Sequence, residues 1–166
     1  VPPSAPVSLT LPVINTPSLL MTKSVPVGNE VQIFPTVWQA TFQIDVTNNG
    51  NLTLTNLDIQ DDLTAFVAPA TLLTAQYPVT IQVTGLPSAT ANPSYDGVTN
   101  VSLLAAGASI DPGETGQILI TVTYSTQGGY PAGTNTVIGT SPILTGPVTA
   151  TAVTVAESLV SDVAGQ

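Results

Sequence analysis

The sequence contains no cysteine and no histidine, and its only cationic side chain is that of Lys23. The missing thiols and imidazoles exclude disulfides, the usual zinc sites and a Ser-His-Asp triad. One cation cannot neutralise a phosphate backbone, so nucleic-acid binding is excluded as well. No apolar run is long enough to span a membrane, and we expect no transmembrane segment. With most catalytic side chains missing, we expect no enzymatic activity and no cofactor.

Charged residues are also scarce, at 7% of the chain, although the net charge is −9. Solubility must therefore come largely from hydroxyl and amide groups. Threonine and valine are abundant beside 15 Pro and 13 Gly, a mixture that favours strands joined by tight turns over helices. A chain of 166 residues is expected to form one core. It begins at Val1 rather than methionine, which we take to favour a processed, exported product.

Apolar and polar residues alternate along most of the chain after residue 18, the period-2 pattern of half-buried strands. The turn Asn48-Asn49-Gly50-Asn51 predicts a hairpin, because Asn and Gly accept positive φ. Two further turns are predicted at 111–114 and 128–131, and a short helical turn within 64–78. The alternating segments are 19–27, 41–47, 52–60, 79–84, 98–104, 117–124, 134–139 and 148–155.

The first 18 residues form an arm set apart by prolines, with apolar side chains at Val7, Leu9, Leu11 and Val13. Their spacing predicts one more strand, fenced by Pro2, Pro3, Pro6 and Pro17. The predicted organisation is an arm at 1–18 that is a candidate donor strand, a β-sandwich domain at 19–156 and a C-terminal tail at 157–166.

The segment FQIDVTNNGNLTLTNLDIQDDL, at 42–63, resembles the signature of the DUF11 type of repeat domain from large bacterial and archaeal surface proteins. LLAAGASIDPGETGQILITVTY at 103–124 and TNTVIGT at 134–140 are similar to two further blocks of that family, and TKSV matches its first strand. The resemblance covers roughly residues 19–155. It implies an immunoglobulin-like antiparallel β-sandwich in an extracellular stalk, adhesin or surface layer, without enzymatic activity.

Three polar residues lie on apolar strand faces, and the resemblance places them at patterned positions of the family. Lys23 shares parity with Leu19, Met21, Val25 and Val27. Asp61 shares a face with Leu57 and Ile59, and Asn135 shares one with Val137. Burying an ammonium or a carboxylate costs several kcal/mol unless the charge is paired. All three side chains are therefore predicted to point toward apolar faces, where a charged group needs a partner.

Three interpretations of Lys23 stay open. It could form a buried ion pair with Asp61, with Asn135 as hydrogen-bond partner, or it could be exposed and without a role. The third is a spontaneous isopeptide bond to Asn135, in which burial keeps the amine uncharged and a protonated Asp61 polarises the amide carbonyl. Such a link would close 135 − 23 = 112 residues and would be worth roughly 4 to 5 kcal/mol in loop entropy.

Weaker candidates concern metal and glycans. Three carboxylates lie close together in the sequence, at Asp58, Asp61 and Asp62. They suggest a calcium site or, more simply, a solvated acidic strand end. Their spacing matches neither an EF-hand nor an RTX repeat. Asn51 and Asn100 each begin an Asn-x-Ser/Thr sequon and are glycosylation candidates. Trp38, beside Phe34, is expected to be a core anchor rather than a sugar-binding platform.

The arm determines the functional prediction. Within one chain it could cover a sheet edge, whereas between chains it could add a strand to a neighbour by donor-strand exchange and propagate a filament. We expect an extracellular, cell-surface structural subunit whose partners are copies of itself. The alternative is a stalk or adhesin module of a longer repeat protein, with the arm as a linker, and a hydrolase using paired carboxylates is a distant third. Receptors and surface glycans cannot be named from the sequence.

Overall fold

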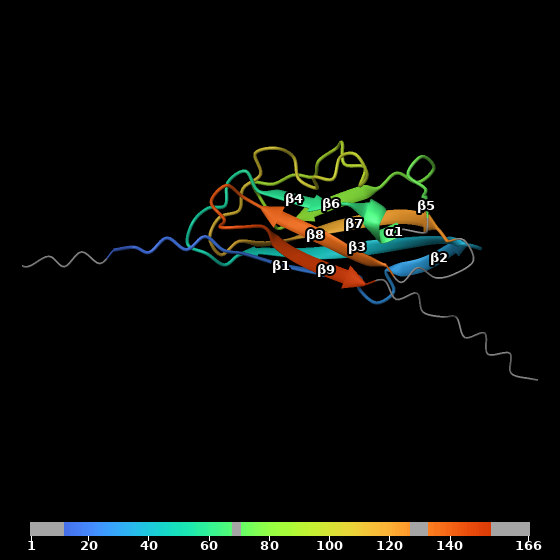
Figure 1. The fold of residues 1–166 in the computed structure, drawn as a ribbon, viewed down its shortest axis with the longest axis horizontal. Coiled ribbons are helices and arrows are strands. Elements are labelled where there is room, and N and C mark those ends of the chain that lie inside the picture. The colour runs from blue at the N-terminus through green and yellow to red at the C-terminus, as the bar shows by residue number, and fades with distance from the viewer. Residues whose placement is uncertain (1–11, 68–70, 127–132, 154–166) are drawn as a thin grey trace, which may run out of the picture.

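The computed structural model describes residues 12–67, 71–126 and 133–153. Its strands form two antiparallel sheets packed face to face, so the predicted all-β sandwich is confirmed (Figure 1). The larger sheet contains β1 (Leu19–Ser24), β2 (Glu30–Phe34), β3 (Val37–Asn48), β5 (Thr71–Leu72), β6 (Thr80–Thr84) and β7 (Thr115–Ser125). The smaller sheet contains β4 (Asp58–Asp61), β8 (Thr134–Thr140) and β9 (Val148–Val153), and the short helix α1 (Leu63–Val67) follows β4.

The two longest strands, β3 and β7, pair along their whole length and form the centre of the larger sheet. The other side of β3 is shared by β2 and β1, and the other side of β7 is shared by β5 and β6. In the smaller sheet β8 lies between β4 and β9. Residues 101–103 bond to the outer edge of β4, through Asp61 N to Val101 O and Leu103 N to Ile59 O. Within the described residues, the outer edge of β6 has no strand beside it.

The core lies between the sheets and follows directly from strand alternation, because every second side chain of a strand points to the same face. In β3 the even positions are buried and the odd positions are half-buried. The ring of Phe66, from α1, packs edge-on against Phe42 at 5.1 Å and against Tyr124 at 5.3 Å between centroids. The fully buried large side chains include Phe42, Ile44, Val46, Leu54, Ile59, Leu63, Phe66, Leu103, Ile110, Ile118, Ile120 and Tyr124.

The outer face of β3 and β7 carries hydroxyl and amide groups that bond across the strands. Thr41 and Thr121 are joined through their Oγ1 atoms at 2.9 Å, and Thr47 and Thr115 at 3.0 Å. The side chain of Gln117 donates to Asp45 at 3.2 Å. Cross-strand pairs of this kind stabilise a sheet while leaving its surface hydrated. The sheet therefore needs few charges on its outer face, as the composition indicates.

Most of the alternating segments are strands, but the predicted hairpin at Asn48 is wrong. Segments 19–27, 41–47, 79–84, 117–124, 134–139 and 148–155 contain β1, β3, β6, β7, β8 and β9. After Asn48, however, the chain crosses to the other sheet, and β4 pairs with β8 rather than with β3. The Asn48 side chain is buried and bonds to Leu52 O at 2.7 Å and to Ile110 O at 2.9 Å, which directs the crossing.

Segment 98–104 is not a strand either and contributes only isolated bridges at Ser102 and Leu104. Its first residues are held in a turn, since the Asp96 carboxylate accepts from the backbone N–H groups of Val98, Thr99 and Asn100. Strands β2 and β5 were not predicted. The predicted turn at 111–114 is present, with Glu114 N bonded to Asp111 O, and the helical turn is α1. The turn at 128–131 and the tail at 157–166 lie outside the described residues.

Candidate functional site

Lys23, Asp61 and Asn135 meet inside the sandwich, as strand parity predicts. Lys23 is the fifth residue of β1 in the larger sheet, whereas Asp61 ends β4 and Asn135 is the second residue of β8, both in the smaller sheet. All three are buried, with 7%, 0% and 1% of their surface exposed. The site therefore spans the two layers and is closed to solvent, which excludes the interpretation of Lys23 as an exposed residue.

The contact between Lys23 and Asp61 is direct. Nζ of Lys23 lies 2.5 Å from Oδ2 of Asp61, and both side chains are fully withdrawn from water. Nδ2 of Asn135 donates to the same oxygen at 3.4 Å. The ring of Phe42 lies on another side of the ammonium, with its centroid 4.9 Å from Nζ, where its π face attracts a cation. The ion pair that the sequence allows is present in this arrangement.

Asp61 is fixed by its backbone as well as by its side chain. Its N–H donates to Val101 O at 2.9 Å, and its carbonyl accepts the hydroxyl of Tyr95 at 3.1 Å. Tyr95 is itself buried, but it lies outside every alternating segment of the sequence, so periodicity gave no sign of this role. Because the backbone of Asp61 is held on both sides, its carboxyl group has little freedom to follow the lysine if the pair is disturbed.

Burial favours the neutral forms of both Lys23 and Asp61. Removal from water lowers the pKa of Lys23 below its ordinary value, and the neighbouring Asp61 carboxylate opposes this change. Removal from water likewise raises the pKa of Asp61, against the charge and hydrogen bond of Lys23 and the hydrogen bond of Asn135. Burial therefore makes the transfer of the proton from Nζ to the carboxylate less costly than it would be in water.

Two oxygens of the site have no hydrogen-bond partner among the described residues, namely Oδ1 of Asp61 and Oδ1 of Asn135. Both are acceptors when Asp61 is ionised, so neither can satisfy the other. Buried polar atoms are rarely left unpaired, since each costs about 1–3 kcal/mol. A proton on Asp61 would turn one of these acceptors into a donor.

The calcium hypothesis for Asp58, Asp61 and Asp62 is wrong. Asp61 points inward to Lys23, whereas Asp62 accepts hydrogen bonds from the N–H and hydroxyl of Thr64, and Asp58 accepts one from Gln60. Side chains of neighbouring strand positions point to opposite faces, which separates carboxylates that are close in sequence. Among the described residues, no group of three or more acidic side chains could hold a metal ion.

Asn51, a sequon residue, holds the root of the arm. Its Nδ2 donates to Ile14 O at 2.7 Å, its Oδ1 accepts from Thr16 N at 2.7 Å, and its own N–H donates to Thr16 O at 3.2 Å. A Cβ on Gly50 would lie 2.4 Å from Thr16 O, so the arm also needs a glycine beneath it. Sequence reasoning assigned Asn51 to a hairpin turn and to a glycosylation sequon and missed this contact. A glycan on Nδ2 would compete with the bond to Ile14.

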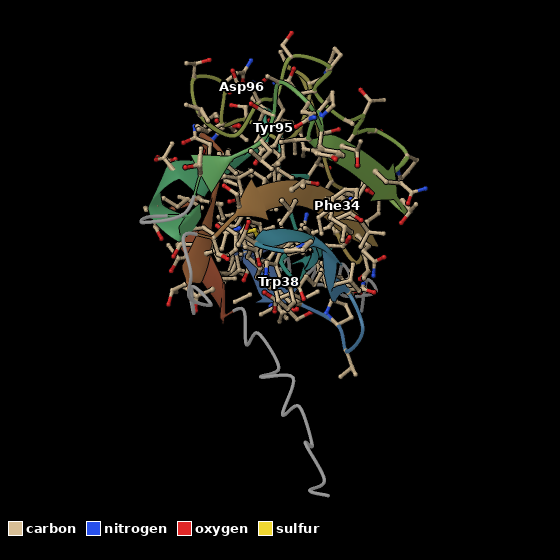
Figure 2. The ribbon with its side chains drawn as sticks, turned by 90° about the vertical axis from the view of Figure 1, so that its right-hand side faces the viewer. Phe34, Trp38, Tyr95 and Asp96 are labelled. Atoms are coloured by element: carbon tan, nitrogen blue, oxygen red, sulfur yellow. The ribbon has the colours of Figure 1, made fainter. Side chains whose placement is uncertain are left out.

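The other sequon residue, Asn100, is half-buried, and its Oδ1 accepts from Asn92 Nδ2 at 3.2 Å. It lies in the turn held by Asp96, which Figure 2 labels among the loops at the top of that view. The bonds that Asp96 accepts, above all from the Thr99 hydroxyl, hold its pKa well below the ordinary value. These bonds are internal to the turn and shape the loop.

Trp38 is buried, with 6% of its surface exposed, so its predicted place in the core is confirmed. Phe34 is 57% exposed at the end of β2 and does not form a pair of sugar-binding rings with it (Figure 2). Of the predicted donor-strand residues, Val13 is 81% exposed. Val7, Leu9 and Leu11 lie outside the described residues.

No family model and no curated protein matches the sequence, so the resemblance to DUF11 domains stays a prediction. Two solved structures are similar in fold at low scores. One is a family 123 glycoside hydrolase from Clostridium perfringens, at 10% identity over 69% of this chain and a TM-score of 0.35. This chain spans only 20% of that hydrolase. The other is an uncharacterized β-sandwich protein from Clostridium difficile, at 12% identity, covering 83% of this chain and 82% of that one, with a TM-score of 0.27.

Within the described residues, no helix has the length and apolar character needed to cross a membrane.

Proposed function

We propose that the chain is an extracellular structural subunit that assembles into a filament by inserting its N-terminal arm into the sandwich of a neighbouring copy. The observation that carries this proposal is the root of the arm. Pro12–Ser18 is not part of either sheet, and Val13 and Ile14 project into solvent with 81% and 75% of their surface exposed. These two exposed apolar side chains support a contact with a partner at this end of the molecule.

The position of the arm suits a head-to-tail contact. Figure 1 shows Pro12–Ser18 at one end of the long axis of the molecule, with β9 running away from that end. Asn51 and Gly50 hold Thr16 against the turn after β3, so the arm leaves the body from a fixed point. Eleven more residues precede Pro12 in the sequence, enough for a strand of ordinary length. A contact of this type is heterologous and propagates instead of closing.

The acceptor that we infer is the outer edge of β6. Strand β6 pairs only with β7 among the described residues. Its inner side chains Ile81 and Val83 are half-buried, whereas Ile118 and Ile120, their partners on β7, are fully buried. One more strand would cover them. The arm of a second copy supplies the matching sequence pattern, with Val7, Leu9 and Leu11 at alternate positions.

A second candidate is a stalk or adhesin module within a longer surface protein, as the DUF11 resemblance implies. The elongated shape favours it, because the described chain starts at one end and its last strand runs toward the other (Figure 1). In that case residues 1–18 connect two domains and do not enter a neighbour. Both candidates give the chain a mechanical role at the cell surface, and neither requires a catalytic site.

Deletion of residues 1–18 separates the two. We expect the full chain to form large species by light scattering at high concentration and the deleted chain to stay monomeric with an unchanged circular dichroism spectrum. Peptide 1–18 added to the deleted chain should bind it and shift backbone NMR signals of β6. A full chain that stays monomeric under all conditions, or a peptide that leaves β6 unchanged, would contradict the donor-strand proposal and favour the stalk module.

A further inference from the structure

We propose that Lys23 and Asn135 become joined by an intramolecular amide bond, formed without any enzyme and promoted by Asp61. The bond would run from Nζ of Lys23 to Cγ of Asn135 and would connect the larger sheet to the smaller one. This inference is independent of the filament, since it concerns one folded chain. It rests on the arrangement of three buried polar groups that the rest of the core does not need.

The arrangement places the nucleophile, Lys23, and the amide of Asn135 around one oxygen of the acid, Asp61. Oδ2 of Asp61 accepts from Nζ of Lys23 at 2.5 Å and from Nδ2 of Asn135 at 3.4 Å. The amine and the amide that would react are thus neighbours on the same acceptor. Water is excluded, because all three residues are buried, so hydrolysis of the amide does not compete. Holding reactants at this proximity replaces a collision between molecules by an intramolecular step.

The step balances without any co-reactant. The ion pair first passes its proton from Nζ to Asp61, which leaves a neutral amine and a carboxylic acid, both favoured by burial. The Asn135 amide, whose Nδ2 faces Asp61 in the observed arrangement, turns so that its Oδ1 accepts a hydrogen bond from the acid, and the amine attacks Cγ. Asp61 then carries the proton released by Nζ to the departing amide nitrogen. A carbon–nitrogen bond to Lys23 forms, the bond from Cγ to Nδ2 breaks, and one ammonia leaves.

The two unpartnered oxygens support this role for Asp61. Oδ1 of Asn135 is the oxygen on which negative charge develops during attack, and it has no donor among the described residues. A protonated Asp61 is the one nearby acid that could supply a donor. Oxyanion stabilisation of this type is commonly a large part of acyl-transfer catalysis. The ring of Phe42, 4.9 Å from Nζ, closes the site on its other side and keeps it apolar.

The link would change how the domain bears load. It would join β1, which directly follows the arm, to β8, which directly precedes β9. Residues 24–134, which lie between the two joined residues, would then be outside the path of force through the covalent chain. A sandwich that lacks cysteine would have its first and penultimate strands covalently fixed, and only the short ends could be pulled out.

The single lysine makes the test unusually direct. Full-length folded chain is analysed by intact mass and is then fully denatured and digested with trypsin. Trypsin has one site in this sequence, after Lys23, and cannot cleave once Nζ is acylated. We expect a chain one ammonia lighter than its sequence that trypsin leaves whole. A chain of full mass that yields fragments 1–23 and 24–166 would overturn the proposal.

Two variants and one control identify the chemistry. Asn135→Ala and Asp61→Asn should both have the mass of their sequences and should both be cut after Lys23. A succinimide at Asn49-Gly50 would also lose one ammonia but would leave Lys23 cleavable, and that result overturns the proposal. The exposed control Asn49→Ala removes this side reaction and must still be one ammonia lighter and uncut. A link that forms unimpaired in Asp61→Asn would exclude Asp61 as its acid.

Discussion

Lys23 of β1 and Asp61 of β4 form one contact across the two sheets, with Nζ 2.5 Å from Oδ2 and neither side chain exposed to water. The only cation of the chain is thus placed inside the core, next to its one fully buried carboxylate among the described residues. Such a pair gains little net stability over apolar residues of the same size, but it is costly to break. Net stability alone therefore does not account for a charged pair at this position.

The first prediction concerns the cost of breaking this pair without any covalent link. In an Asn135→Ala chain, which cannot form the amide, Lys23→Met should lower the free energy of unfolding by about 3–5 kcal/mol, because it leaves Asp61 buried and unpaired. Adding Asp61→Leu should recover most of that loss. Urea unfolding monitored by Trp38 fluorescence measures all three chains. Equal stability of the single and double variants would show that the two side chains are not coupled.

Two buried tyrosines predict a loss of stability at alkaline pH. Burial raises the pKa of Tyr95 and of Tyr124 above the ordinary 10.0, and the bond from Tyr124 to Glu30 adds to the second shift. A raised folded pKa means that the unfolded chain ionises first. The contribution of the two phenols to the free energy of unfolding is therefore complete below pH 10 and falls as the pH rises above it. Urea unfolding on either side of pH 10 should show this fall.

The double variant Tyr95→Phe/Tyr124→Phe should have a lower free energy of unfolding overall. Its free energy of unfolding should decrease less above pH 10 than that of the wild type. Tyr77→Phe is the control, since it leaves both buried phenols in place. The absorbance of tyrosinate provides a second readout, because the two phenols should ionise only together with unfolding. Ionisation of all tyrosines in the folded chain near pH 10 would contradict the burial of these groups.

Asn51 should fix the root of the arm without supporting the core. Asn51→Ala removes the side-chain bonds to Ile14 and Thr16 and should cost about 1 kcal/mol or less, because these bonds are exposed. The amide of Thr16 should then exchange with solvent faster by NMR, while the amides of β3 and β7 stay protected. Asn49→Ala, in the same turn, is the control. An unchanged Thr16 amide would mean that the arm is not held there.

Asn48 should contribute more to stability than Asn49, because its side chain directs the crossing between the sheets. Its side chain is buried and satisfies Leu52 O, Ile110 O and Gly50 N. Asn48→Ala removes the side-chain donor to Leu52 O and one of the two donors to Ile110 O, which also accepts from Leu54 N, and should cost about 1–3 kcal/mol. Thermal unfolding compared with Asn49→Ala tests this difference. Equal losses for the two variants would contradict the assignment.

Local periodicity was sufficient to place the site but not the sheet pairing. Whether a side chain points inward depends only on its strand, so parity correctly placed Lys23, Asp61 and Asn135 in the core. Which strand follows a turn depends on distant contacts, and the bonds from Asn48 to Leu52 and Ile110 decide it. The short strand β2 alternates poorly in burial and left no periodic signal. Tyr95 and Asn51 lie outside the strands, where the alternation of apolar and polar residues does not predict side-chain contacts.

The assembly of subunits through one face of the arm is tested most directly by electron microscopy of two matched variants. Leu9→Asn/Leu11→Asn places amides on the face that we expect to enter β6 of the neighbour, and Ser8→Asn/Thr10→Asn places the same amides on the opposite face. Both changes precede the strands of the sandwich in the sequence, and we expect the sandwich to stay folded. We predict filaments for the wild-type chain and the second variant, and none for the first. Filaments from both variants would contradict donor-strand assembly. The absence of filaments from all three chains, the wild type included, would contradict it as well.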